Sequence, residues 1–417
     1  MPKIRWLLIW LCFLANAIGY IDRANLAIAA KGIQAEMGID PAQMGLILSA
    51  FFWTYAFMQM PAGWVVDRIG VRISLTVAVV WWSLFTMATG AARTVSHFIA
   101  ARLMLGLGES ATMPSFTKTA FNWFPRSERG LACGIFNSGS VAGNVLSLPL
   151  VAWLIAVSGW RGAFVITGLI GLVWALAWWF IYRDPERYRS VAPKQVDTLL
   201  AERVVPPPTA HIPWSSLFKY RSIWGLMIGM FCLNFAIYFF LTWFPSYLLE
   251  ARGFSLVRLG TLGMVPGLMG VAGSWGGGYL SDWLLKRGWS RTAARKTCLV
   301  GGMAIASSIG LAAVVEDTYA CLALFALAYA SLSVVGANVW TVVSEMAPTP
   351  GHVASVGGIN NFAGNLAGIV MPIFIGVMLK YTGGSFLIPL AVAGGFCVVG
   401  ALSYLFLVGK VEPLEAR

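Results

Sequence analysis

The sequence predicts an all-α membrane protein with twelve transmembrane helices in two pseudo-symmetric bundles of six. Of its 417 residues, 58% are apolar and only 11% are charged, which leaves too little polar surface to cover a water-soluble globule of this size. About twelve apolar runs are each long enough to cross the roughly 30 Å of hydrocarbon in a bilayer. Motifs from the first half of the chain recur in the second half, which predicts the pair of bundles.

The expected spans alternate with charged or Pro/Gly-rich breaks. In chain order they cover residues 6–30, 45–66, 73–91, 97–121, 131–154, 161–182, 222–249, 259–281, 297–315, 319–346, 353–378 and 384–408. The first could be mistaken for a signal peptide, because Lys3 and Arg5 precede it and Ala15-Asn16-Ala17 is similar to a cleavage site. We reject that interpretation, since the apolar stretch continues to Ala30 and the other spans follow it.

The longest polar segment separates the two predicted bundles. We assign residues 1–182 to an N-terminal six-helix bundle, 183–221 to a cytoplasmic linker and 222–417 to a C-terminal six-helix bundle. Pro206-Pro207-Pro208 stiffens the linker, and a short amphipathic piece at 214–220 would lie along the membrane surface. A partner-binding role is an alternative, but a tether between the bundles is the simpler interpretation.

Two pairs of motifs show the internal repeat. Gly63-Trp64-Val65-Val66-Asp67-Arg68, after the second span, corresponds to Gly278-Tyr279-Leu280-Ser281-Asp282-Trp283, after the eighth. The fifth and eleventh spans share an Ala-Gly-Asn motif followed by proline, at 142–149 and 363–372. Parallel repeats of six helices build many secondary transporters, which bind their substrate between the halves near the midplane of the bilayer.

Charge and cysteine usage exclude several other classes of protein. With both termini in the cytoplasm, most of the 29 Lys and Arg fall in cytoplasmic loops and tails, so the net charge of +12 follows from topology and does not indicate nucleic acid. All six cysteines lie in apolar spans without paired spacing, so we expect no disulfide and no metal. Phosphate loops, zinc spacings and nucleophile triads are missing from the sequence, so we expect no cofactor and no enzymatic activity.

The sequence resembles a known family over essentially its whole length. Gly63 to Arg72 is similar to the signature loop of the major facilitator superfamily. A finer resemblance, to the anion:cation symporter family within it, rests on Tyr20-Ile21-Asp22-Arg23-Ala24-Asn25-Leu26, Arg102 with Glu109, Asn122-Trp123-Phe124-Pro125, Leu241-Thr242-Trp243-Phe244-Pro245 and Asn361-Phe362-Ala363-Gly364. Bacterial members of that family import sugar acids such as galactonate and glucarate.

Charged residues inside predicted spans each cost about 2.5–3.5 kcal/mol. The clear cases are Asp22, Arg23, Arg102 and Glu109. They could be neutralising pairs that only hold helices together, but intramembrane charges more often serve a function. The resemblance implies that Asp22 and Glu109 couple transport to protons. We expect Arg23 to bind a substrate carboxylate through its two-pronged guanidinium, with Arg102 as a partner for Glu109 and a second candidate ligand.

The resemblance extends to a polar pocket and to gating residues. It implies that Tyr20, Tyr55, Ser140, Trp340 and Asn361 contact the substrate, although any one of them could be simple packing. Galactonate-like members carry Gln where this chain has Ser140, and often Ala-Pro where it has Ser110-Ala111, which implies an altered pocket. In the signature loop we expect Asp67, Arg68 and Arg72, and Asp282 in the repeat, to gate the cytoplasmic side, with Asp67 accepting from a helix N-terminus.

These observations predict a proton-coupled symporter that imports a small organic anion, a sugar acid or hydroxy acid, by alternating access. An exporter of amphipathic compounds and a non-transporting receptor on the same scaffold are the alternatives, and the intramembrane arginines favour the importer. We expect a monomer in the bacterial inner membrane that crosses the bilayer many times, with both termini cytoplasmic, and whose partners are the anion, protons and lipid.

Overall fold

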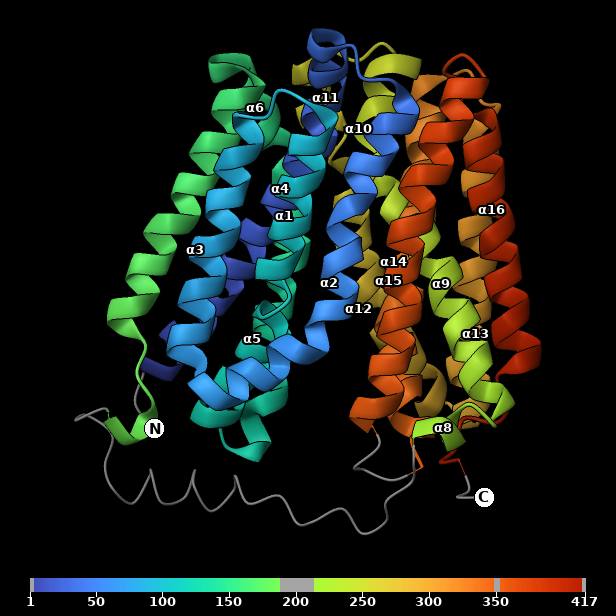
Figure 1. Cartoon of the computed structure of the whole chain (residues 1–417). Coiled ribbons are helices and arrows are strands. Elements are labelled where there is room, and N and C mark those ends of the chain that lie inside the picture. Colours follow the sequence, from blue (N-terminus) through green and yellow to red (C-terminus); the bar gives the residue numbers. More distant parts are fainter. Residues whose placement is uncertain (1–3, 188–213, 349–352, 415–417) are drawn as a thin grey trace. The chain divides into compact units, whose positions relative to one another are not determined.

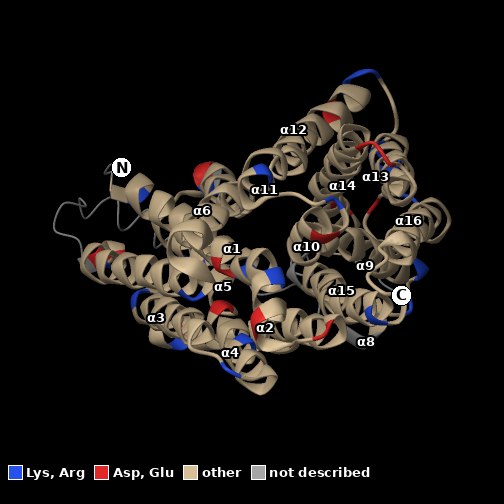
Figure 2. Cartoon of the chain, turned by 90° about the horizontal axis from the view of Figure 1, so that it is seen from above, with Lys and Arg blue, Asp and Glu red and all other residues tan. Residues whose placement is uncertain are grey.

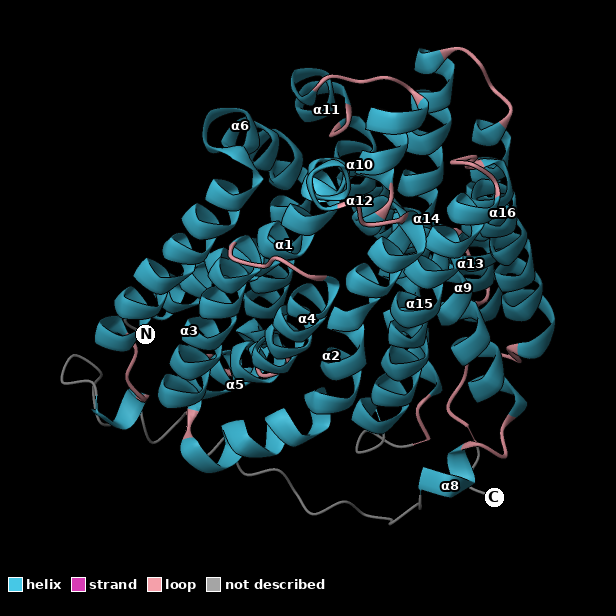
Figure 3. Cartoon of the chain, turned by 45° about the horizontal axis from the view of Figure 1, so that its top comes forward, coloured by secondary structure: helices cyan, strands magenta, loops and turns pink. Residues whose placement is uncertain are grey.

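The computed structural model describes residues 4–187, 214–348 and 353–414. Helices joined by short loops make up these residues (Figures 1 and 3). Residues 188–213, which form most of the predicted linker, lie outside the described residues, so the linker stays a prediction.

The chain divides into two compact units. Unit 1 comprises Met1–Ile39 and Ala50–Pro207, and unit 2 comprises Asp40–Ser49 and Pro208–Arg417. The first residues of the second helix therefore pack with the C-terminal half of the chain, whereas the predicted N-terminal bundle includes them.

The helices of unit 1 pack most extensively against the longest of them, α6. Its helices are α1 (Ile4–Met37), most of α2 (Pro41–Ile69), α3 (Val71–Gly90), α4 (Val95–Glu109), α5 (Thr112–Trp123) and α6 (Arg126–Ile181), followed by the 3₁₀ turn η1 (Pro185–Arg187). The most extensive packing joins α1 to α6, and α3 packs against both α6 and α4. The buried charged residues named above lie on α1 and α4, inside this unit.

Unit 2 contains the remaining helices. They are α8 (Trp214–Leu217), α9 (Arg221–Thr242), α10 (Phe244–Ser246), the π turn η2 (Tyr247–Ala251), α11 (Leu256–Leu262), α12 (Val265–Lys286), α13 (Arg291–Ala306), the 3₁₀ segment η3 (Ser307–Ala313), α14 (Thr318–Met346), α15 (Val353–Tyr381), α16 (Leu387–Leu402) and the π turn η5 (Ser403–Leu407). Within it, α12 packs on α14 and α9 packs on α15.

Nine helices in the described part of the chain are long and apolar enough to cross a membrane. The longest, α6, bends at Gly159, whose φ of 71° favours glycine, and so supplies two spans. The helix α2 and the α4–α5 pair are not among these nine, and adding them gives the twelve spans that the sequence predicts. Outward-facing apolar side chains fit a lipid environment: Val173, Leu176 and Phe180, on one face of α6, are 67%, 61% and 69% exposed.

The span predicted over residues 97–121 consists of two helices. The helix is interrupted at Ser110 and Ala111, which separate α4 from α5. Pro114 explains the interruption, because it has no backbone N–H to donate to the carbonyl of Ser110. As a result, Glu109 is the last residue of α4.

Several glycines lie where two helix backbones make close contact. A Cβ on Gly143 of α6 would lie 2.4 Å from the carbonyl oxygen of Ala17 on α1, and one on Gly139 would lie 2.3 Å from that of Phe13. On α12, a Cβ on Gly273 would lie 2.1 Å from the carbonyl oxygen of Ala330. These positions hold glycine because the neighbouring backbone leaves no room for a side chain.

Candidate functional site

Few charges are present on the helices, as Figure 2 shows by the mostly tan ribbon. Three of those in unit 1 are almost completely buried: Asp22 is 0%, Arg102 is 3% and Glu109 is 2% exposed. Burying a charge is costly unless it is paired, so the contacts of these groups define what the cluster can do.

Arg23 and Glu109 form an ion pair. The Nη2 of Arg23 lies 2.5 Å from the Oε2 of Glu109, and its Nε donates to the same oxygen at 2.6 Å. The other oxygen, Oε1, has no hydrogen-bond partner within the described residues. A carboxylate that accepts from two guanidinium nitrogens is held firmly in place.

Three aromatic rings surround the Arg23 guanidinium. Its Cζ lies 4.9 Å from the ring centre of Tyr20 and 4.6 Å from those of Phe51 and Tyr55. Tyr20 is one turn from Arg23 on α1, whereas Phe51 and Tyr55 are one turn apart on α2. Cation–π contacts in a desolvated site hold the faces of the planar guanidinium. The N–H groups at its edge can still donate to anions.

Arg102 makes its hydrogen bond to the backbone of α1. Its Nη2 donates to the backbone oxygen of Arg23 at 3.1 Å, and its Nε is unpartnered within the described residues. The carboxylate of Glu109 therefore pairs with Arg23 on another helix, and not with Arg102 on its own helix. Two guanidinium groups share this region with the carboxyls of Glu109 and Asp22, so the cluster has a surplus positive charge, which suits an anion, only while one of the two acids is protonated.

Asp22 lies beside this pair but faces other helices. Across the described residues, neither of its oxygens has a hydrogen-bond partner. Thr86 on α3 and Thr167 on α6 lie near its carboxyl. The Thr167 hydroxyl accepts from Asn25 at 2.8 Å and donates to the Phe164 carbonyl at 3.4 Å.

A small pocket opens against the Arg23–Glu109 pair. It is lined by Tyr20, Arg23, Tyr55 and Glu109, which the sequence singled out, together with residues that it did not, namely Ala15, Asn16, Gly19, Trp82, Thr112 and Met113. Glu109 lies against α1 at Gly19, where a Cβ would be in ordinary van der Waals contact with its Oε2, at 3.7 Å. Trp82 and Thr112 carry buried polar atoms without partners in the described part of the chain, which makes them further candidate contacts.

The other predicted pocket residues are divided between the units. Ser140 on α6 is half-buried beside the phenol of Tyr20, and its hydroxyl donates to the Asn137 carbonyl at 2.7 Å. Trp340 on α14, which is 44% exposed, and Asn361 on α15 belong to unit 2. These assignments remain predictions.

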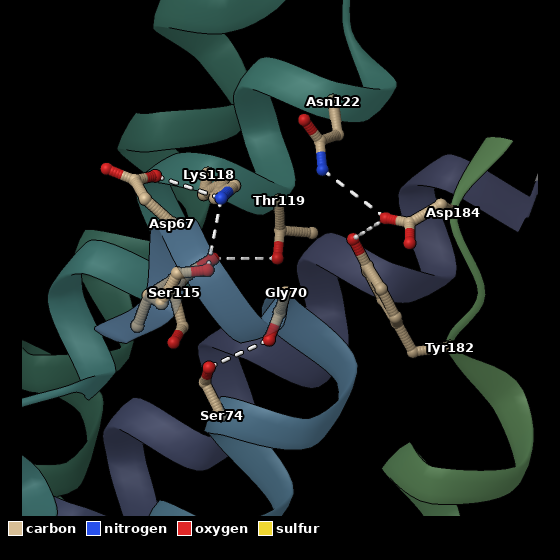
Figure 4. A network of polar contacts seen from close by, with 10 residues as sticks. Asp67, Gly70, Ser74, Ser115, Lys118, Thr119, Asn122, Tyr182 and Asp184 are labelled. Atoms are coloured by element: carbon tan, nitrogen blue, oxygen red, sulfur yellow. Dashed lines mark hydrogen bonds and ion pairs between the residues drawn. The ribbon is translucent and has the colours of Figure 1, made fainter. Parts of the chain in front are cut away.

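At the end of α2, the signature loop makes side-chain contacts that the sequence did not predict. Lys118 on α5 donates to the carboxylate of Asp67 at 2.9 Å and to the Val66 carbonyl at 3.0 Å (Figure 4). Asp67 therefore pairs with a lysine on α5, and its carboxylate is 76% exposed.

Arg68 and Arg72 pack against tryptophans. The Cζ of Arg68 lies 5.2 Å from the ring of Trp64. Arg72 on α3 donates to the Trp179 carbonyl on α6 at 2.7 Å and 3.0 Å and lies 4.2 Å from that ring. These contacts join α3 to the end of α6.

Unit 2 contains a related network around Asp282. The Nη1 of Arg295 on α13 lies 3.7 Å from Asp282 and donates to Ser281 at 2.6 Å, both on α12. Its Nη2 lies 2.9 Å from Glu345 on α14. One arginine thus connects three helices, and Asp282 is its weaker and more exposed partner. The described residues contain no group of three or more His, Cys, Asp or Glu that could hold a metal ion.

Comparison with known proteins identifies the class. The chain is 33% identical to the D-galactonate transporter of Escherichia coli O6:H1 (strain CFT073), over 98% of this chain and 96% of that protein. It is 34% identical to a probable galactarate/D-glucarate transporter of Bacillus subtilis (strain 168), over 100% and 94%. A bacterial homolog of the human lysosomal transporter Spinster, solved in an inward-facing and unoccupied conformation, has a TM-score of 0.80 and 18% identity, with 98% of each chain covered.

The helical fold and these relatives define a multi-pass membrane transporter, which is not an enzyme. The sequence model of the Major Facilitator Superfamily matches residues 12–372 of the chain, so the chain belongs to that family.

Proposed function

We propose that this protein imports a small organic anion, a sugar acid or hydroxy acid, together with protons by alternating access across the bacterial inner membrane. The observation that carries the proposal is the buried Arg23–Glu109 pair at the wall of a pocket. The relatives named as galactonate and galactarate/glucarate transporters support a sugar acid as the substrate.

The pair suggests how an anion and a proton would be coupled. The guanidinium of Arg23 is already engaged by the carboxylate of Glu109, so a substrate carboxylate competes for the same donors. Two carboxylates that bind the same cation repel each other unless one of them is protonated and therefore neutral. A proton on Glu109 would release Arg23 for the substrate, and loss of that proton would displace the substrate. Asp22 would supply a second group that binds and releases a proton.

Uptake into proteoliposomes tests the proposal. We expect labelled D-galactonate, D-glucarate or a hexuronate to accumulate when the side of entry is more acidic, and accumulation to stop when a protonophore removes the gradient. Substrate counterflow at equal pH would continue, because exchange needs no net proton movement.

Three outcomes would overturn the proposal. Accumulation that followed a sodium gradient and ignored pH would remove the proton coupling. Failure to transport any aldonate, aldarate, uronate or hydroxy acid would remove the substrate class. Proton-driven efflux of uncharged amphipathic compounds would favour an exporter.

A further inference from the structure

The C-terminal segment of the chain, residues 408–414, lies across the ends of other helices of unit 2, and we call it the strap. It follows the π turn η5, whose last carbonyls accept from two cations. Lys296 on α13 donates to the Leu405 carbonyl at 3.0 Å, and Arg221 on α9 donates to the Phe406 carbonyl at 2.8 Å. Cations at the end of a helix stabilise its unsatisfied carbonyls. The start of the strap is therefore held by two helices.

Two backbone N–H groups of the strap donate to side-chain hydroxyls of other helices. Gly409 donates to Ser222 on α9 at 3.0 Å, and Val411 donates to Thr292 on α13 at 2.9 Å. Each hydroxyl belongs to the second residue of its helix. A hydroxyl oxygen can accept such a bond while its helix keeps its own backbone bonds. The strap therefore connects the first turns of α9 and α13.

The strap also reaches α14 and has apolar contacts of its own. Leu414 donates from its backbone N–H to the carbonyl of Met346, the last residue of α14, at 3.1 Å. The side chains of Val408 and Val411 are buried. A Cβ on Gly225 of α9 would lie 2.8 Å from the backbone nitrogen of Val408, so the glycine leaves room for the strap. Hydrogen bonds and buried side chains thus hold this chain end in place.

The end of α14 that the strap contacts lies next to an ion pair. Glu345 precedes Met346, and its carboxylate lies 2.9 Å from the Nη2 of Arg295 on α13. Arg295 also donates to Ser281 on α12 at 2.6 Å. Two different contacts therefore fix the same end of α14, one through its backbone and one through a charge. Movement of α14 relative to α9 requires the strap to release one of them.

We propose that the strap restrains the conformational step of transport by holding the end of α14 to α9 and α13, with Ser222 and Thr292 as the positioning residues that keep it closed. The inference rests on the proposed transport of an anion and not on its coupling to protons. Where a conformational step limits the rate, weakening a contact that must break before that step raises the rate. The pocket beside Arg23 is lined by no strap residue, so the affinity for substrate should not change.

Removing one acceptor at a time tests the inference in the full chain. Thr292→Val and Ser222→Ala leave the strap sequence intact. We expect the maximal rate of counterflow of labelled D-galactonate or D-glucarate at equal pH to rise roughly threefold or more in each, with KM unchanged. Hydrogen exchange of the C-terminal peptide, followed by mass spectrometry, should be slow in wild type and faster in both variants. Thr292→Ser keeps an acceptor and should restore both wild-type values.

Ser344 provides a matched control in the last turn of α14. It is exposed, and its hydroxyl donates to the Trp340 carbonyl of its own helix at 2.9 Å. Ser344→Ala should therefore keep the wild-type rate and the wild-type exchange.

Several outcomes would overturn the inference. They are fast exchange of the strap in wild type, an unchanged or lower counterflow rate in both Thr292→Val and Ser222→Ala, and an equal rise in Ser344→Ala. If a variant unfolds in thermal scans, slow or fast exchange of the wild-type strap still supports or contradicts its closed state. Lack of counterflow in the wild-type protein would instead overturn the proposed function, so the two failures are distinguishable.

Discussion

Arg23 on α1 and Glu109 on α4 are separated by 86 positions in sequence, yet their side chains meet at 2.5 Å in a buried site. The guanidinium is held by aromatic rings as well as by the carboxylate, so its position does not depend on the ion pair alone. We therefore expect that a second anion can replace Glu109 without displacing the cation.

Neutral variants of the two acids should separate coupling from binding. We expect Glu109→Gln and Asp22→Asn each to abolish accumulation driven by a pH gradient while counterflow at equal pH persists. The amides keep much of the size and polarity of the acids but cannot cycle a proton. Proteoliposome uptake with and without the gradient measures both activities.

Glu36 provides the matched control for these variants. Its carboxylate also pairs with an arginine, Arg161, and accepts from Trp160 at 2.7 Å, but none of these residues lines the pocket. Glu36→Gln should keep gradient-driven accumulation. Wild-type accumulation in both the Glu109→Gln and Asp22→Asn proteins would remove them from the coupling mechanism.

Much of the fold could be predicted from the sequence because lipid requires long apolar helices, and composition alone shows these. The boundary between the fifth and sixth spans was predicted close to Gly159, where α6 bends. The interruption after Glu109 was missed, because Pro114 alone does not show whether a helix will kink or stop. Likewise, nothing in a local pattern shows that the first residues of α2 pack with unit 2.

The candidate site was predictable in its members but not in its pairing. Charged residues inside apolar spans are conspicuous, so Asp22, Arg23, Arg102 and Glu109 stood out. The sequence suggested Arg102 as a partner for Glu109, but the carboxylate forms its ion pair with Arg23 on another helix, and that depends on tertiary packing. Trp82 and Thr112 gave no signal, since apolar spans contain many such residues.

Replacing Arg23 by lysine should not be conservative. We expect Arg23→Lys to weaken binding of a carboxylate substrate at least tenfold, or about 1.4 kcal/mol, because a point charge replaces a two-pronged contact that stacks on aromatic rings. Isothermal titration calorimetry measures the affinity.

Arg161 serves as the control because it also pairs with a carboxylate and lies 4.1 Å from an aromatic ring, that of Trp160, away from the pocket. Arg161→Lys should bind the substrate as wild type does. Unchanged affinity in Arg23→Lys would make Arg102 the preferred ligand for the carboxylate.

Acid should weaken the start of α2 through Asp40. This residue and Gln43 form a capping box, in which the Gln43 N–H donates to Asp40 at 2.9 Å and the Asp40 N–H donates to the Gln43 side chain at 3.1 Å. The Gln43 backbone N–H, and then Lys380, hold the pKa of Asp40 below its usual value. A lowered pKa in the folded state means that this stabilisation is present above about pH 4 and is lost as the pH falls through the folded value.

Thermal unfolding of the purified protein between pH 7 and pH 3 tests this cap. We expect Asp40→Ala to cost about 1 kcal/mol at neutral pH, and its melting temperature to approach that of wild type in acid. Asp40→Asn keeps an oxygen acceptor for the Gln43 N–H, so it should lose less at neutral pH. A constant difference between wild type and Asp40→Ala across this range would show that ionisation of Asp40 contributes nothing.

Ser140 should influence which acid is transported. It is half-buried beside Tyr20, a residue of the pocket wall. Its hydroxyl donates back to its own helix, so it offers the substrate at most one short polar group. A glutamine would extend two donors and an acceptor from the same position. We therefore expect Ser140→Gln to shift preference toward linear aldonates and away from the native substrate.

The measurement is competition uptake with a panel of aldonates, aldarates, uronates and short hydroxy acids. Ser138 provides the control, because it lies on the same helix, is exposed, and also donates to a backbone carbonyl of its own helix, that of Ile135 at 2.7 Å. Ser138→Gln should keep the wild-type ranking of substrates. A site built to hydrogen-bond a substrate hydroxyl rejects analogues that misplace it far more strongly than an apolar site does, so a real change of contact should reorder the panel. An identical ranking in Ser140→Gln and wild type would show that Ser140 does not set selectivity.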